Sequence, residues 1–176
     1  MSSVYQEFTR TTQRAEDKPF LQVPYLAAKG YSDTAINLSY GQTLQIVTDL
    51  IRQYQSKGYG APMRIGLVLE NRPEFFFHWL ALNALSCSVL PISATSQLDE
   101  IAYFLEHGEP VLVVAIPESV DLLERACQLI ANPVPVIGLN RFGNLPEAPG
   151  SGAQLSGPED NGMLECALLY TSGSTG

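Results

Sequence analysis

The chain has 176 residues and a mass of 19.2 kDa, which is enough for one domain with a proper core and too little for two ordinary ones. Eighteen acidic against ten basic residues give a net charge of −8, which argues against a nucleic-acid binder or an anionic-membrane binder, because both need a basic surface. Charged residues make up only 16%, against an average of about 25%, so we expect something outside this chain to cover part of its surface.

The first elements predicted along the chain are a polar helix and a hairpin. Within residues 1–17, a helix is predicted over 3–16, with Val4 and Phe8 on one face. Residues 18–38 are predicted to form a hairpin, with strands over 20–25 and 35–38 on either side of turn-forming residues. Ser39 and Gln42 then match a capping box, which predicts the start of a helix that ends at Gly58.

Helices and strands alternate over residues 39–139. After the capped helix, strands are predicted over 64–69, 87–92, 111–116 and 134–139, with helices over 73–85, 98–107 (ending at Gly108) and 119–131 between them. The strands are short, continuous runs of Val, Ile and Leu, which is typical of strands covered by helices on both faces. The sequence therefore predicts an α/β fold with a mostly parallel sheet, helices on both faces and a small β-hairpin excursion.

The alternation stops at residues 140–162, where Gly, Pro, Asn and Ser dominate, and we predict a mobile surface loop there. Residues 163–176 contain one more apolar strand over 166–170. The chain then ends in six residues drawn only from Ser, Thr and Gly, which are Thr171, Ser172, Gly173, Ser174, Thr175 and Gly176. Neither a Gly-x-Gly-x-x-Gly fingerprint after a strand nor a Walker A loop is present.

These six terminal residues offer the most informative chemistry in the sequence. Glycine lets backbone N–H groups turn toward one point, and Ser and Thr add hydroxyl donors. Together they can surround a polyphosphate with uncharged donors, at the end of a strand where α/β folds place their ligands. The alternative interpretation is a flexible Ser/Gly-rich chain end without a binding role.

Residues 168–176 (LLYTSGSTG) resemble the phosphate-binding signature Tyr-Thr-Ser-Gly-Ser/Thr-Thr-Gly of the adenylate-forming superfamily, which includes acyl-CoA synthetases, luciferases and the adenylation domains of peptide synthetases. Two upstream segments are also similar to that family's motifs, namely residues 38–44 and residues 71–75 together with 82–92. One departure is Ser86, which stands where the family usually has Gly. The resemblance extends over the chain from Phe20 onward and implies the N-terminal portion of the large adenylate-forming domain.

The resemblance implies ATP-dependent activation of a carboxylate to an acyl-adenylate, followed by thioester formation with coenzyme A or a carrier pantetheine, most typically by an acyl-CoA synthetase. It implies that Thr171, Ser172, Gly173, Ser174, Thr175 and Gly176 contact ATP, with Thr171 and Ser172 contributing hydroxyls. Mg²⁺ and lysines neutralise charge in the family. The lysines, the magnesium-binding motif and the catalytic lysine of the C-terminal domain lie downstream of this signature, so no catalytic residue and no metal ligand are assigned here.

These 176 residues alone are therefore predicted not to form an acyl-adenylate. Their expected partners are the remainder of the enzyme and the carboxylate substrate. Two alternatives stay open. One is a non-catalytic α/β binding or interaction module, and the other is a different nucleotide-binding protein whose terminal run is coincidental. The carboxylate itself is not indicated by the sequence.

The cysteines and histidines indicate structural roles. Cys87, Cys127 and Cys166 each lie in an apolar run, which predicts buried, reduced thiols. Neither His78 nor His107 lies at a zinc-site spacing from a cysteine. His78 is predicted to be a hydrogen-bonded or exposed helix residue, and the aromatic residues around it to pack in the core. Because no apolar run has the length of a membrane span and residues 1–14 lack a signal-peptide pattern, a cytoplasmic location is expected.

Overall fold

A computed structural model of the chain describes residues 3–150 and 165–170. In the element names that follow, η marks a short 3-10 helix. The elements in chain order are α1 (Val4–Ala15), β1 (Pro19–Val23), α2 (Tyr25–Ala28), β2 (Ile36–Ser39), α3 (Tyr40–Ser56), β3 (Arg64–Val68), α4 (Pro73–Ala84), β4 (Ser88–Pro91), α5 (Leu98–Gly108), β5 (Leu112–Ala115), η1 (Pro117–Ser119), α6 (Val120–Cys127), β6 (Val136–Gly138) and η2 (Leu139–Asn144).

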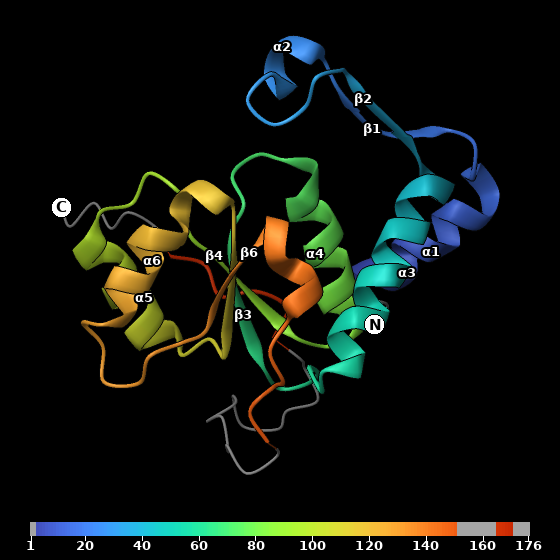
Figure 1. Ribbon diagram of the computed structural model, residues 1–176. Coiled ribbons are helices and arrows are strands. Elements are labelled where there is room, and N and C mark those ends of the chain that lie inside the picture. Colours follow the sequence, from blue (N-terminus) through green and yellow to red (C-terminus); the bar gives the residue numbers. More distant parts are fainter. Residues whose placement is uncertain (1–2, 151–164, 171–176) are drawn as a thin grey trace, which may run out of the picture.

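A four-stranded parallel sheet in the order β4-β3-β5-β6 forms the centre of the molecule. Helices α3 and α4 cover one face, and α5 and α6 cover the other (Figure 1). Successive residues of β5 point to opposite faces, so that Leu112 packs under α3 and α4 while Val113 packs under α5 and α6. The predicted α/β fold with both faces covered is confirmed.

The hairpin excursion is also present. Strands β1 and β2 pair in antiparallel fashion and project away from the central sheet (Figure 1). The rings of Phe8, Phe20 and Tyr40 lie 5.0–5.9 Å apart and fasten the base of the hairpin to α1 and α3. The first strand is shorter than predicted, because Pro24 cannot donate a ladder hydrogen bond and instead precedes the short helix α2, which begins at Tyr25.

The helix boundaries agree with two predictions, the capping box at Ser39 and the end of a helix at Gly108. The Ser39 hydroxyl accepts a hydrogen bond from the Gln42 amide, and the Gln42 side chain accepts one from the Ser39 amide, as the capping box requires. Helix α5 ends at Gly108, and the residue that follows, Glu109, has the left-handed conformation with φ 46°. A Cβ atom at Gly108 would lie 2.6 Å from a methyl group of Leu90, so glycine serves the close approach of α5 to β4.

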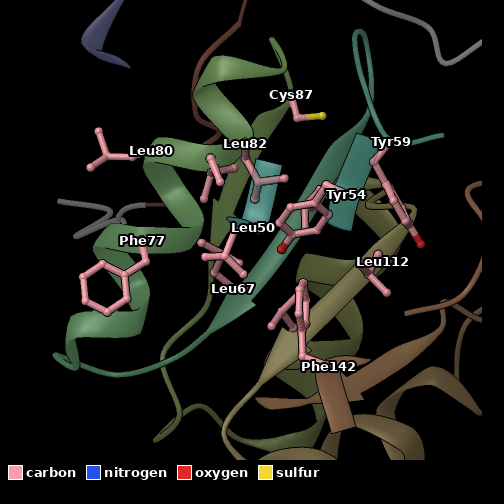
Figure 2. Close-up of a cluster of buried hydrophobic side chains, with 14 of the residues drawn as sticks. Leu50, Tyr54, Tyr59, Leu67, Phe77, Leu80, Leu82, Cys87, Leu112 and Phe142 are labelled. Carbon is pink, nitrogen blue, oxygen red and sulfur yellow. The ribbon is translucent and has the colours of Figure 1, made fainter. Parts of the chain in front are cut away.

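The segment predicted as a loop over residues 140–162 begins with structure instead. Residues 139–144 form η2, and Phe142 and Leu145 are both buried. The ring centre of Phe142 lies 5.3 Å from that of Tyr54 and 4.8 Å from that of His78. Figure 2 shows Phe142 and Tyr54 in the same buried cluster. Two large apolar side chains three residues apart match a single 3-10 turn, which is too short for helical periodicity to reveal. Residues 151–162 lie outside the described residues.

Candidate nucleotide-binding site

The six predicted phosphate-binding residues, 171–176, lie outside the described residues. The segment that leads to them is described and is called here the approach segment, residues 165–170 (red in Figure 1). It joins the sheet beside β4 through one parallel bridge, in which the Val89 amide donates to the Cys166 carbonyl at 3.2 Å and the Leu168 amide donates to the Val89 carbonyl at 2.9 Å. The strand predicted over 166–170 is thus reduced to a single bridge between Val89 and Ala167.

This reduced pairing also corrects the prediction for one thiol. Cys166 is exposed, whereas Cys87 and Cys127 are buried as predicted. The apolar run around Cys166 indicated a central strand, but among the described strands only β4 pairs with the approach segment. A strand covered on both faces would bury every side chain, while this segment leaves both Cys166 and Leu169 exposed.

An ion pair fixes the beginning of the approach segment. Glu165 accepts two hydrogen bonds from the Arg64 guanidinium, from Nε at 2.8 Å and from Nη2 at 3.0 Å. A third hydrogen bond runs from Arg64 Nη1 to the Gly108 carbonyl at the end of α5. The bonding to Arg64 lowers the pKa of Glu165, and the bonding to Glu165 raises the pKa of Arg64. One arginine of β3 therefore connects the segment to α5.

Aromatic rings hold the end of the approach segment. The Tyr170 hydroxyl and His107 Nδ1 share a hydrogen bond of 2.5 Å. The Tyr170 ring lies 4.7 Å from that of Phe104 and 6.0 Å from that of Tyr103, between ring centres. Neither the Tyr170 contacts nor the Arg64–Glu165 pair was predicted from the sequence, because the partners are separated by 63 and 101 residues.

A cleft of about 660 Å³ opens at the carboxyl ends of β3 and β4, the edge at which α/β folds bind ligands. Arg72 contributes to its wall and is held between Glu70 at 3.1 Å and Glu118 at 3.8 Å, with the Tyr31 ring 4.8 Å from its guanidinium carbon. Because both carboxylates balance its charge, Arg72 is not a free anion-binding group. The remaining lining residues are Ala27, Leu67, Leu69, Asn71, Phe75, Pro91, Ile92, Ser93, Ala94 and Thr95.

His78 is hydrogen-bonded, as one of its two predicted alternatives stated, and it is buried in the core. Its Nδ1 forms a 2.8 Å hydrogen bond with the Tyr54 hydroxyl, and burial lowers the pKa of His78 to about 3. A neutral, enclosed imidazole of this kind stabilises packing rather than transferring protons to a ligand. The predicted core packing of the neighbouring aromatic residues holds for Phe77, which is buried, while Phe75 borders the carboxyl-edge cleft and Phe76 is 40% exposed.

Over residues 3–150 and 165–170, no three His, Cys, Asp or Glu side chains gather in a way that would hold a metal ion. The same residues include no helix with the length and apolar character needed to cross a bilayer. The described part of the chain thus offers no side-chain cluster for Mg²⁺.

Comparison with known proteins identifies the family. The model of the AMP-binding enzyme family matches residues 8–176, so the chain belongs to that family and its expected membership of the adenylate-forming superfamily is confirmed. Sulfoacetate–CoA ligase from Cupriavidus necator is 26% identical over 164 residues, which cover 91% of this chain and 30% of that protein. The chain therefore spans less than a third of the length of this relative.

Solved structures agree on the fold. The inhibitor-bound N-terminal domain of FACL13 from Mycobacterium tuberculosis matches with a TM-score of 0.72 at 19% identity, covering 100% of this chain and 42% of that one. VinN in complex with 3-methylaspartate matches with a TM-score of 0.72 at 17% identity, covering 99% of this chain and 45% of that one. At these identities the similarity shows a shared fold.

Proposed function

We propose that the chain is the N-terminal portion of an ATP-dependent acid–thiol ligase, an acyl-CoA synthetase. The observation that carries the proposal is the run Thr171 to Gly176, which ends a family match of nearly the whole chain and follows a segment paired in parallel with β4. The full reaction joins a carboxylate to the α-phosphorus of ATP with release of pyrophosphate. A thiol of coenzyme A or of a carrier pantetheine then displaces AMP.

The role proposed for this chain is to hold the β- and γ-phosphates with neutral donors. Thr171 and Ser172 supply hydroxyls, and the glycines allow backbone amides to approach the phosphate oxygens. The reaction brings an anionic carboxylate to an anionic triphosphate, so charge must be neutralised in the transition state. Arg64 and Arg72 are both paired with carboxylates in this chain, whose net charge is −8. Neutralisation is therefore assigned to Mg²⁺ and to residues beyond this chain, and residues 1–176 alone are proposed to be inactive.

The experiment is ATP–pyrophosphate exchange with the protein encoded by the complete reading frame, over a panel of carboxylates. The panel includes sulfoacetate, because one relative is named for it, together with fatty, aromatic and amino acids. Exchange with one class, followed by AMP release on addition of coenzyme A, supports the proposal. Absence of exchange with every class favours the non-catalytic module. Turnover by residues 1–176 alone contradicts the proposal that these residues are inactive without the remainder of the enzyme.

A pair of variants tests the loop itself. Thr171→Ala and Ser172→Ala should each lower kcat/KM for ATP by about 10- to 100-fold, because each removes a donor aimed at phosphate charge. Thr34→Ala is the matched control, since Thr34 is exposed in the hairpin and its hydroxyl has no hydrogen-bond partner among the described residues. Unchanged kinetics in both loop variants would remove the loop from the ATP site.

A further inference from the structure

We infer that His107 and Tyr103 of α5 are positioning residues for ATP binding, which act by holding Tyr170, the residue bonded directly to Thr171. This inference rests on the proposed function, because it assumes that residues 171–176 bind phosphates. The inference extends the proposed ATP site to the C-terminal half of α5, a part of the fold that the sequence motifs did not indicate.

The backbone pairing of the approach segment is too sparse to define where Tyr170 lies. A full strand beside β4 would fix every residue through its ladder, yet the described pairing consists of the single bridge at Ala167. Beyond Leu168, no described backbone hydrogen bond ties the segment to the sheet. The position of Tyr170 therefore depends on its side-chain contacts.

Those contacts form a ring cluster of four residues, Tyr103, Phe104, His107 and Tyr170. His107 stacks on Tyr103, with ring centres 5.7 Å apart and planes 16° from parallel, and it shares a hydrogen bond with the Tyr170 hydroxyl. Phe104 packs against the Tyr170 ring at 4.7 Å. Tyr103 orients His107, and His107 in turn restrains Tyr170 with a directional bond.

The same helix is fastened to the other end of the segment. Arg64 bonds both Glu165 and the Gly108 carbonyl, so α5 and the start of the approach segment share one anchor. The close packing of Gly108 on Leu90 keeps the end of α5 in register with β4. An ångström-scale displacement of Tyr170 would move the first residue of the loop, and such displacements impair the alignment of bound groups.

The test uses the protein from the complete reading frame and measures the Kd of ATP by calorimetry, with KM for ATP and for the carboxylate measured separately. Tyr170→Phe removes only the hydroxyl, and His107→Ala removes the imidazole that shares its hydrogen bond. Both should weaken ATP binding about fivefold, the effect of one ordinary hydrogen bond, and leave KM for the carboxylate unchanged. His107→Gln, whose amide can either donate or accept a hydrogen bond, should recover most of the affinity. Tyr25→Phe, at an exposed tyrosine of the hairpin, is the matched control and should bind like the unaltered protein.

The outcomes separate the two hypotheses. If the unaltered protein binds no ATP, the proposed function is wrong and this inference falls with it. If the unaltered protein binds ATP and Tyr170→Phe binds it equally well, the inference alone is wrong. A lower melting temperature with equal rises in both KM values would also contradict it, because that pattern reports a general loss of structure rather than positioning of the loop.

Discussion

The buried Tyr54–His78 pair predicts a loss of stability in weak acid. An unfolded histidine has a pKa of 6.5, and burial lowers the folded-state pKa of His78 to about 3. The unfolded state therefore binds a proton as the pH falls below 6.5, while the folded state does not until near pH 3. The contribution of His78 is fully present above pH 6.5 and is lost progressively as the pH falls toward 3. Between pH 8 and pH 5 the linkage relation gives a loss of about 2 kcal/mol.

The measurement is urea unfolding of the chain at pH 8 and at pH 5, compared with His78→Asn. The asparagine amide occupies the place of Nδ1 beside the Tyr54 hydroxyl and does not titrate. The variant is expected to be less stable at both pH values, because the ring contact with Phe142 is lost. The decisive quantity is the difference between the free energies of unfolding of the two proteins. This difference should be about 2 kcal/mol smaller at pH 5 than at pH 8. A gap that is equal at both pH values would refute the enclosed, neutral state of His78.

Three further predictions concern other residues. Ser86 has φ 57°, a conformation that costs a non-glycine residue about 1–2 kcal/mol. Ser86→Gly should therefore stabilise the chain and raise the Tm in thermal unfolding by about 2 °C. Ala84→Gly, at the last residue of α4, should lower the Tm instead. Ser39→Ala removes the hydroxyl that caps α3 and should cost about 1 kcal/mol in urea unfolding. Cys166 should react with a thiol reagent in the folded chain while Cys87, whose pKa burial raises to about 12, should not; modification of both at equal rates would contradict the described exposure.

The arrangement of helices on both faces of the sheet could be predicted, because it follows from the hydrophobicity of consecutive residues in each strand. All four residues of β5 are apolar and buried, and Leu112 and Val113 pack on opposite faces. A continuous apolar run of this kind is stable only where helices cover both faces, so the pattern itself indicates a parallel sheet. The start of α3 was predictable for a similar reason, since Ser39 and Gln42 act on backbone groups within one turn.

The errors arise where tertiary packing overrides a local pattern. At Gly108 the predicted end of the helix is correct, but its role differs from that of a left-handed cap: the missing side chain allows contact with Leu90, and Glu109 takes the left-handed conformation. Phe142 lies among turn-forming residues and is nevertheless buried against Tyr54. Local sequence around Phe142 holds no information on this partner, because Tyr54 lies on α3, far away along the chain.

The same reasoning applies to the candidate site. The binding loop of neutral donors could be predicted from the sequence, because phosphate-binding chemistry favours Gly, Ser and Thr at adjacent positions. The placement of the approach segment before it depends instead on contacts such as Arg64 with Glu165 and His107 with Tyr170. These residue types are ordinary, and their spacing follows only from the order of the strands. Among the described residues, a single bridge ties the approach segment to β4. Substitutions on α5 are therefore expected to affect the predicted loop, although α5 lies far from it in sequence. Under the proposed function, the affinity for ATP is therefore expected to be the property most sensitive to these contacts, and general stability the least.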